Sequence, residues 1–370
     1  MPELLVYVGT YTERTPDGSG SKGIYAARFD TMSGKLSGLT PVAELQNPSW
    51  VTVSRDRRLL YAVSEVGTPD ATGALAGLVV AYTIGADGKL TELNRVSSGG
   101  ADPCHLAIDR SGRTVAVANY TGGSTVAFHV GADGRLGAAS KDQHVGKGPN
   151  AARQEAPHAH SVNFVADDRL LLSCDLGNDH VYVYRHDPRS GAIAAHKPAF
   201  VGLEPGSGPR HLAVHPSQRY VYVLTELTSH VATFAWNPSA GTLVQRQSIS
   251  TVPLGTPSTN STAEIVVHPN GRFVYASNRG HDSIAVFSVD ARNGRLKLLA
   301  NTPTGGNVPR NFAVDASGRW LLAANQRSNS IVSFAIDPSS GTLAPNGATL
   351  AVPRPVCVAF VPSAATPARG

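Results

Sequence analysis

The sequence is poor in the features that mark secreted, metal-knotted or membrane-spanning chains. Its three cysteines are an odd number without CxxC spacing, which argues against a disulfide framework or a zinc knot. No apolar run approaches the roughly 18 residues that a membrane span needs. Residues 1–3 lead directly into strand-like sequence, without a basic or apolar export region. These absences predict a reduced, cytoplasmic protein with no membrane partner.

Charge of one sign and aromatic side chains are also scarce. The net charge is only +5 and the basic residues are scattered, so no nucleic-acid partner is predicted. Aromatic residues make up 6% of the chain, which weakens the case for a platform that binds proteins through an apolar rim. A locally positive site for a small anionic molecule stays open.

Glycine and proline, by contrast, are plentiful, with 37 and 25 residues. They separate short β-branched runs, a pattern typical of strands in a meander. Within residues 208–243, strands are predicted at 211–214, 220–224 and 231–236, and a fourth is predicted at 243–248.

This four-strand order recurs along the chain and predicts a β-propeller. The turns DRSGR, HPNGR and DASGR repeat, and units begin near Asn47, Asp102, His158, Gly208, Ser261 and Val308. A period of about 50 residues is typical of propeller blades. Residues 4–44 and a closing strand at 354–360 would form one further blade. We therefore expect an all-β, seven-bladed propeller of four-stranded antiparallel blades, a single domain over 1–370, closed by pairing of its N- and C-terminal strands.

Two positions of the repeat change chemistry from blade to blade, whereas positions that serve only folding should look alike. They share the face that carries the long loops 66–77 and 141–156, where function is expected. The first position, at the start of the innermost strand, reads Ser49, Cys104, His160, Arg210, Ala263, Arg310 and Val356. The second, after the next strand, reads Tyr11, Glu65, Tyr120, Leu176, Glu226, Arg279 and Gln326. The position before it is small and polar throughout, and is predicted to satisfy turn amides.

Charged side chains gather at one mouth of the predicted channel, and each has a structural alternative. Glu65 and Glu226 could be solvated carboxylates, and Glu226 and Arg279 are expected on solvent-facing loops. Arg210 and Arg310 each follow a proline and could pair with backbone carbonyls between blades.

The histidines have alternatives too. His158 and His160 have a spacing that some metal sites use, but no third ligand stands at a suitable distance, so no metal is predicted. His105 and His211 are interpreted as packing residues.

A histidine, a glutamate and several arginines support proton transfer at an anionic, oxygen-rich substrate. Glu226 or His160 could accept a proton, and guanidinium groups could bind the anion and a developing oxyanion. The arginines should hold Glu226 ionised and keep His160 neutral. Lactone hydrolysis, or the reverse lactonisation, fits without a cofactor.

Several segments resemble the propeller-type lactonase family, which includes bacterial seven-bladed 6-phosphogluconolactonases and the fungal carboxymuconate-lactonising enzyme. These segments are PHAHSVNF (157–164), GPRHLAVHP (208–216), LTEL (224–227), HPNGRFVYASNRG (268–280) and VPRNFAVDASG (308–318). The resemblance covers about 4–360. It implies that the catalytic residues are His160, Arg210, Glu226 and Arg279. The residues predicted to bind substrate around them are His158, Arg310, Tyr120, Glu65 and Gln326.

The resulting prediction is a metal-independent carboxylic-ester hydrolase that opens a sugar-acid lactone, specifically 6-phosphogluconolactone. It is expected to be a monomer or a weak homo-oligomer. A muconate-type lactonising cycloisomerase and a non-enzymatic binding platform stay open. The sequence does not decide between Glu226 and His160 as the base.

Overall fold

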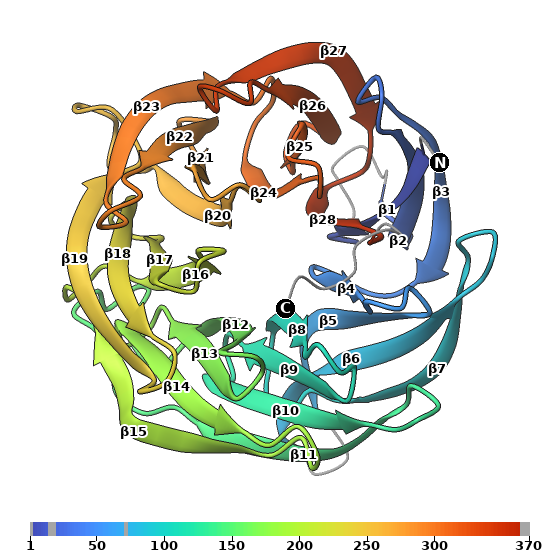
Figure 1. Ribbon diagram of the computed structural model, residues 1–370. Coiled ribbons are helices and arrows are strands. Elements are labelled where there is room, and N and C mark those ends of the chain that lie inside the picture. The colour runs from blue at the N-terminus through green and yellow to red at the C-terminus, as the bar shows by residue number, and fades with distance from the viewer. Residues whose placement is uncertain (1–2, 14–19, 70–72, 363–370) are drawn as a thin grey trace.

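The structure is a computed structural model that describes residues 3–13, 20–69 and 73–362. All regular elements within these ranges are β-strands, which form seven four-stranded sheets. Figure 1 shows the sheets arranged as blades around a central channel. The predicted seven-bladed, all-β propeller is confirmed.

Each blade is an antiparallel meander of four strands, ordered from an innermost strand beside the channel to an outermost strand at the rim. From blade 1 to blade 7, the innermost strands are β28 (Pro355–Phe360), β4 (Val51–Val53), β8 (Pro103–Ile108), β12 (Ala159–Val165), β16 (Pro209–Val214), β20 (Ser261–Val267) and β24 (Pro309–Val314). The second strands are β1 (Glu3–Thr10), β5 (Leu59–Pro69), β9 (Thr114–Asn119), β13 (Leu170–Asp175), β17 (Tyr220–Thr225), β21 (Phe273–Arg279) and β25 (Trp320–Asn325). The third strands are β2 (Gly23–Asp30), β6 (Leu75–Ile84), β10 (Ser124–Val130), β14 (His180–His186), β18 (His230–Asn237), β22 (Ser283–Val289) and β26 (Ser330–Ile336). The outermost strands are β3 (Leu36–Glu44), β7 (Leu90–Ser97), β11 (Leu136–Gln143), β15 (Ile193–Gly202), β19 (Thr242–Ser250), β23 (Leu296–Pro303) and β27 (Leu343–Ala351).

The core lies between neighbouring blades. All six residues of β17 are buried, whereas β19, at the rim of the same blade, is largely exposed. Phe234 and Trp236 of blade 5 pack in one cluster with Leu172 and Val183 of blade 4. Because each blade buries apolar side chains against its neighbours, 370 residues can share a ring of small cores without needing one large core.

The ring is closed by the two ends of the described chain. Strand β28 pairs antiparallel with β1, with Tyr7 opposite Ala359 and Val8 opposite Val358. The side chain of Val358 also packs with Leu322 of blade 7. The predicted pairing of terminal strands is therefore confirmed, and it gives blade 1 the same four strands as the other blades.

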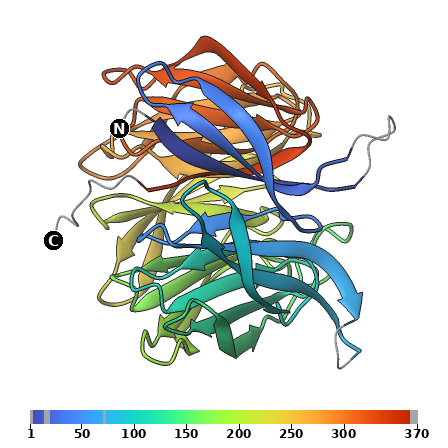
Figure 2. The same cartoon turned by 90° about the vertical axis from the view of Figure 1, so that its right-hand side faces the viewer.

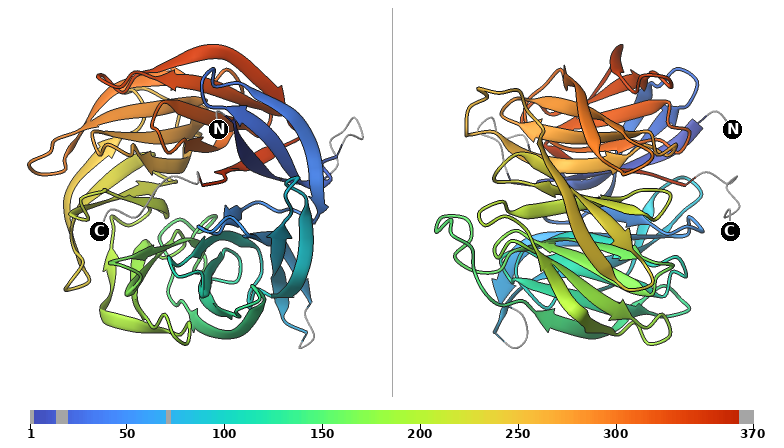
Figure 3. Two further views of the ribbon diagram at one scale, coloured as in Figure 1. Left: turned by 45° about the vertical axis from the view of Figure 1, so that its right-hand side comes forward. Right: turned by 60° about the vertical axis from the view of Figure 1, so that its left-hand side comes forward.

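The prediction of a loop at residues 66–77 is wrong. Strand β5 continues to Pro69 and pairs with β6, with Thr68 opposite Ala76 and Pro69 opposite Leu75. The paired ends of β5 and β6 extend this hairpin beyond the ring (Figure 2, Figure 3), and residues 70–72 of the predicted loop lie outside the described residues. The other predicted loop, 141–156, is shorter than expected, because β11 continues to Gln143.

The small polar position of the repeat has a structural role, although the predicted partner is mostly wrong. The side-chain amides of Asn119, Asn278 and Asn325 donate to the carbonyls of Ser98, Thr251 and Thr304, at 3.0, 3.1 and 3.2 Å. Each acceptor follows the outermost strand of the preceding blade. These side chains therefore tie one blade to the next through a carbonyl, where a turn amide was expected.

Removing the chain from Pro353 onward should open the ring. Strand β28 would be lost, together with the buried side chains of Val356, Cys357 and Val358, each contributing about 1.5–3 kcal/mol. The bare edge of β1 should then recruit other chains. Size-exclusion chromatography and thermal unfolding should show aggregation and a lower Tm. A truncated chain with the size and Tm of the full-length protein would contradict this account of closure.

Candidate active site

The two variable positions of the repeat lie at one end of the channel. In six blades, the backbone N–H after the second strand donates to the carbonyl two residues before the first variable position. The N–O distance is 2.7 Å from Glu226 to Gly208 and 2.8 Å from Tyr120 to Asp102. These bonds hold the start of an innermost strand beside the end of its neighbour, so both sets of side chains face the same mouth.

A β-bulge directs the first of these side chains. The strand ladders of β8, β12, β16 and β24 skip one residue each, namely Cys104, His160, Arg210 and Arg310. In three of these blades the backbone two residues earlier has positive φ, at Asp102 (54°), Gly208 (64°) and Val308 (58°). Bulges commonly re-aim a side chain beside a functional site. Here they turn a strand residue towards the channel.

A cavity of about 300 Å³ opens at this mouth. The residues that line it are Glu65, Cys104, Tyr120, Arg153, His160, Glu226, Ser261, Arg279 and Arg310. A narrow continuation towards the channel axis is lined by Arg210 and His211 as well as by His160 and Arg310. Four arginines and two glutamates therefore line these two spaces together with His160 and His211, and with both histidines neutral the formal excess is two positive charges.

Glu226 is the centre of this cluster. Its Oε2 lies 2.8 Å from Arg210 Nε and 2.9 Å from Arg279 Nη2, and its Oε1 lies 2.6 Å from Arg153 Nη2. The Glu226 side chain is only 5% exposed. Charge-assisted bonds of this kind are about twice as strong as neutral ones, so one carboxylate fixes three guanidinium groups.

The arginines control the ionisation of Glu226. Burial alone would raise the pKa of its carboxyl, but the charges of Arg279, Arg210 and Arg153 outweigh burial and hold that pKa far below its ordinary value. Burial lowers the pKa of Arg279 to about 10, which still leaves it charged at neutral pH. The carboxylate is thus permanently ionised, as predicted, and is a weak proton acceptor.

Two of the three arginines also donate to backbone carbonyls of blade 6, which is the next blade for Arg210 and the blade of Arg279 itself. Arg210 Nη1 donates to the carbonyl of Ala263, and Arg279 Nη2 donates to the carbonyl of Thr262 at 2.6 Å. Arg210 therefore pairs with a backbone carbonyl of the neighbouring blade, which was the structural alternative, and it is also part of the charged cluster. Both guanidinium groups are held from two sides.

His160 lies at the floor of the cavity. Its ring meets Tyr120 and His211 edge-on, with centroid distances of 5.4 and 5.3 Å, and its Nδ1 is 3.7 Å from Cys104 Sγ. Burial, followed by the charges of Arg210, His211 and Arg310, lowers the pKa of His160 well below its ordinary value. The imidazole is neutral at pH 7, as predicted.

Arg310 also lines the cavity. Its Nη2 donates to Tyr11 Oη at 2.8 Å, and Tyr11 Oη donates to Glu65 Oε1 at 2.9 Å. Its guanidinium also lies over the Tyr11 ring, 5.2 Å from the centroid. Unlike the other three arginines, it has no carboxylate within ion-pair distance among the described residues. Most of its donors are available to a ligand.

His158 supports the wall of the cavity without lining it. Its ring stacks on Tyr120 with a centroid distance of 4.4 Å, its Nδ1 lies 3.1 Å from Tyr120 O, and its Nε2 lies 3.1 Å from Glu155 Oε1. Both ring nitrogens are thus engaged by protein atoms. In the described ranges, no three His, Cys, Asp or Glu side chains gather in a way that would hold a metal ion.

Gln326, like His158, is a predicted substrate-binding residue that does not line the cavity. It occupies the expected place after β25, where its N–H donates to Val308 O at 3.0 Å, but its side chain is not part of the lining.

Arg153 is the functional side chain that sequence reasoning missed. It lies between β11 and β12, outside the repeat, so no register position could reveal it. Its neighbour Gln154 is fully buried and donates from Nε2 to Leu176 O and Asp179 Oδ1, both at 2.8 Å. That anchor fixes the connection, and Arg153 reaches across to Glu226 and to Tyr120 Oη, the latter at 3.3 Å.

Two further expectations are wrong. Glu226 and Arg279 do not lie on solvent-facing loops, because the arginine cluster and the next blade enclose them, leaving the Arg279 side chain 14% exposed. His211 is more than a packing residue, because its Nε2 lies 3.2 Å from Arg210 Nη1 and its Nδ1 lies 3.0 Å from Glu264 Oε1. His105 does pack, with its ring 4.1 Å from that of Trp50.

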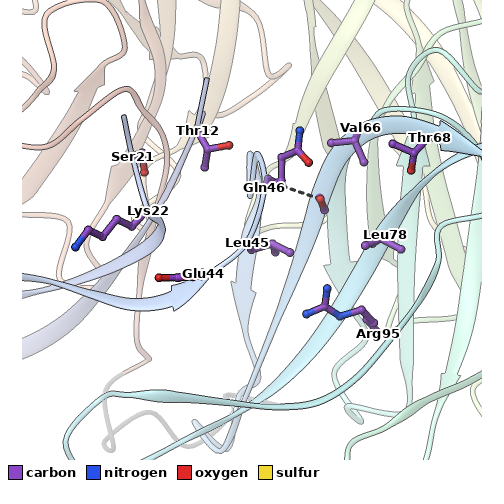
Figure 4. A pocket seen from close by; sticks show the side chains of 11 residues that line it. Thr12, Ser21, Lys22, Glu44, Leu45, Gln46, Val66, Thr68, Leu78 and Arg95 are labelled. Atoms are coloured by element: carbon purple, nitrogen blue, oxygen red, sulfur yellow. Dashed lines mark hydrogen bonds between the residues drawn. The ribbon is translucent and has the colours of Figure 1, made fainter. Parts of the chain in front are cut away.

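A larger groove of about 560 Å³ lies between blades 1 and 2, but its side chains do not converge. Figure 4 shows Lys22 pointing away from Arg95 across this groove. Arg95 is paired with Glu92 on the exposed edge. With no cluster of acid, base and anion-binding groups, this groove is a weaker candidate than the channel mouth.

No helix with the length and apolar character of a membrane span occurs in the part of the chain that the structure describes.

Comparison with known proteins agrees with this fold. Residues 5–360 match the family described as "Lactonase, 7-bladed beta-propeller". The chain belongs to this family of lactonases, which are hydrolases of cyclic carboxylic esters.

Named relatives cover almost the whole chain. A 6-phosphogluconolactonase of Bacillus subtilis (strain 168) is 37% identical over 98% of this chain and 99% of its own length. A 6-phosphogluconolactonase of Formosa agariphila is 34% identical over 84% and 86% of the two chains. The structure of the periplasmic gluconolactonase PpgL of Pseudomonas aeruginosa has a TM-score of 0.88 and 33% identity, covering 97% of this chain and 99% of that one.

Replacing Glu226 by Gln should damage both the cluster and the activity. Three guanidinium groups would lose their counter-charge, and removing one partner of a buried ion pair costs about 3–5 kcal/mol. We expect a lower Tm and a fall in lactonase kcat/KM of roughly 100-fold or more. Thermal unfolding and steady-state kinetics check both effects.

Glu92→Gln is the matched control, because it breaks the exposed pair with Arg95. It should change the free energy of unfolding by no more than about 0.5 kcal/mol. If Glu226→Gln behaves like Glu92→Gln, Glu226 does not organise the site.

Proposed function

We propose that this protein hydrolyses 6-phosphogluconolactone to 6-phosphogluconate at the mouth of the channel. The observation that carries the proposal is the cavity's excess of two positive charges around a neutral imidazole. A phosphate monoester carries about −1.5 to −2 charge at pH 7, which matches that excess. The names of the Bacillus and Formosa relatives support the same substrate.

Arg310 is the proposed anchor of the phosphate group. Its guanidinium has no carboxylate partner among the described residues, and Tyr11 holds it in place by a hydrogen bond and by its ring face. Guanidinium groups bind phosphate oxygens in a bidentate manner. The other arginines are occupied by Glu226, so Arg310 is the group best prepared for a doubly charged ligand.

We assign the role of general base to His160 and not to Glu226. Both oxygens of Glu226 already accept bonds from guanidinium groups, and its low pKa makes it a weak acceptor. His160 is neutral and lines the cavity. With its Nδ1 towards Cys104 Sγ, Nε2 is the nitrogen available to accept a proton.

The proposed reaction needs one water and no other reactant. His160 removes a proton from the water as its oxygen bonds to the lactone carbonyl carbon, and Arg279 stabilises the oxyanion that forms. The bond from that carbon to the ring oxygen then breaks, and the imidazolium gives its proton to the leaving oxygen. The products are a hydroxyl group and a carboxylic acid, which releases a proton to solvent at neutral pH.

The test is a coupled assay of 6-phosphogluconolactone loss, corrected for spontaneous hydrolysis, with unphosphorylated gluconolactone as a parallel substrate. We expect turnover of the phosphorylated lactone to be favoured. Arg310→Ala should raise KM for it by at least about tenfold and change KM for gluconolactone little. Equal losses on both substrates would remove Arg310 as the phosphate anchor. No turnover of either lactone would refute the proposed function.

His160→Asn should separate catalysis from binding. Losing a general base typically costs about 10²–10⁴-fold in rate, so kcat should fall by that factor, while KM for 6-phosphogluconolactone stays close to the wild-type value because Arg310 is intact.

His215→Asn is the matched control, since His215 binds Ser217 and Gly271 in the turns at the other end of the blades. It should leave kcat unchanged. Full turnover by His160→Asn would return the role of base to Glu226.

We further propose that residues 1–370 act as one domain in the cytoplasm, as a monomer or weak homo-oligomer, within carbohydrate metabolism. Three free, buried cysteines suit a reducing compartment, although the Pseudomonas neighbour is described as periplasmic. No specific observation favours a lactonising cycloisomerase or a binding platform over hydrolysis.

A further inference from the structure

A second group of buried polar side chains lies below the active site, further along the same innermost strands. It comprises His105 of β8, His211 of β16, Glu264 of β20 and Asn311 of β24, all less than 8% exposed. The proposed reaction uses none of them directly. Burying a carboxylate and two imidazoles costs free energy unless they are well bonded, so their arrangement calls for a physical account.

Hydrogen bonds join this group to the catalytic cluster in one column. Arg210 Nη1 lies 3.2 Å from His211 Nε2, His211 Nδ1 lies 3.0 Å from Glu264 Oε1, and Asn311 Nδ2 lies 2.7 Å from Glu264 Oε2. Arg210 in turn binds Glu226. Asn311 Oδ1 accepts from the N–H of Val358, so strand β28 holds Asn311 at the end of this column of hydrogen bonds.

The chemistry of arginine fixes the direction of these bonds. A guanidinium group can only donate, so His211 Nε2 must present a lone pair to Arg210. Neutral His211 therefore carries its proton on Nδ1 and donates it to Glu264. An ionised Glu264, which also accepts from Ile265 N–H at 2.9 Å, is the acceptor that keeps His211 in this tautomer.

We infer that Glu264 is a positioning residue, which acts through His211 to hold Arg210 in the geometry that the active site requires. When Glu264 gains a proton, its hydroxyl must donate, and His211 Nδ1 becomes the acceptor. The His211 proton then moves to Nε2 and faces a guanidinium donor at 3.2 Å. Two donors cannot share a hydrogen bond, so Arg210 loses this support.

The surroundings of Glu264 put this change in the neutral pH range. Burial raises the pKa of Glu264 to about 7, against the lowering effects of the Ile265 N–H, His105, Arg210 and Asn311. Its neighbours also include His211 on β16 and the Cys357 thiol on β28. A cavity of about 280 Å³, lined by Trp50, His105, Glu264 and Asn311, adjoins this side of the column and gives protons a path.

The inference rests on the proposed lactonase activity, and its main test is Glu264→Gln. We expect kcat/KM to fall by roughly 10- to 100-fold, as for a catalytic group displaced by about 1 Å. The ionised form is the active one, so the ratio of wild-type to variant kcat should rise with pH through about 7. The phosphate of the substrate titrates with both enzymes and cancels in the ratio.

Two further variants tell positioning from general destabilisation. In an Arg210→Lys background, Glu264→Gln should have no further effect, because the group it positions is gone. Tyr184→Phe removes the hydrogen bonds that Tyr184 of blade 4 makes to His144 and Asp142 of blade 3. It should lower Tm without changing the pH profile. The inference is overturned if Arg210→Lys and Glu264→Gln lower kcat/KM additively. It is also overturned if the ratio of wild-type to Glu264→Gln kcat does not depend on pH.

Asn311→Asp keeps the test available if Glu264→Gln does not fold. A second carboxylate beside Glu264 should raise the pKa of Glu264 and move the acidic limb of the pH profile of kcat above pH 7. If this limb does not move, the inference is also overturned.

The His211 tautomer, read by ¹⁵N NMR, does not depend on activity. Above pH 8 we expect His211 to carry its proton on Nδ1. A proton on Nε2 at this pH would refute the proposed hydrogen bonds from Arg210 through His211 to Glu264. An inactive wild-type protein with the expected tautomer would instead refute the proposed function alone.

Discussion

The site depends on a single buried carboxylate that forms ion pairs with three guanidinium groups. Without Glu226, Arg153, Arg210 and Arg279 would repel one another in a space from which water is largely excluded. With Glu226 between them, the three arginines form a rigid cluster. This cluster keeps a net positive charge, because one carboxylate offsets only one guanidinium group. Arg310 also lines the cavity and keeps the positive excess available to an anionic ligand. Burial, reinforced by these positive charges, lowers the pKa of His160 and leaves its imidazole neutral.

The propeller makes this cluster possible because it brings one side chain from each of several blades to a common axis. A bulge at the start of four innermost strands turns the side chain inward, and a backbone hydrogen bond sets the neighbouring strand end beside it. The fold alone does not specify the chemistry. The β-propeller domain of Myceliophteria thermophila Cps50 has a TM-score of 0.62 with this chain at 13% identity, a likeness of fold only.

The fold and the repeat-borne part of the site could be predicted from the sequence, because turn residues and short β-branched runs recur with a fixed period. Comparing equivalent positions then separated side chains that vary from those that stay alike, and this pointed to His160, Arg210, Glu226, Arg279 and Arg310. Arg153 could not be found in this way, because it lies in a connection whose path is set by the buried Gln154.

Burial was the other quantity that the sequence could not supply. A glutamate after a strand suggests solvent, and only the three-dimensional arrangement shows that arginines from two blades and one connection enclose Glu226. His211 and Glu264 likewise sit at ordinary strand positions, where an apolar or a packing role is the simplest expectation. Their hydrogen bonds to Arg210 and to each other appear only when the blades are placed around the ring.

The central claim is that a positively charged cavity keeps a neutral imidazole ready to accept a proton. The most direct measurement is a ¹⁵N NMR titration of His160 in the full-length protein, with His160→Asn used to assign its signals. The account predicts that His160 stays neutral from pH 8 down to pH 6.5, the ordinary pKa of histidine. A His160 ring that is protonated at pH 7 would contradict it.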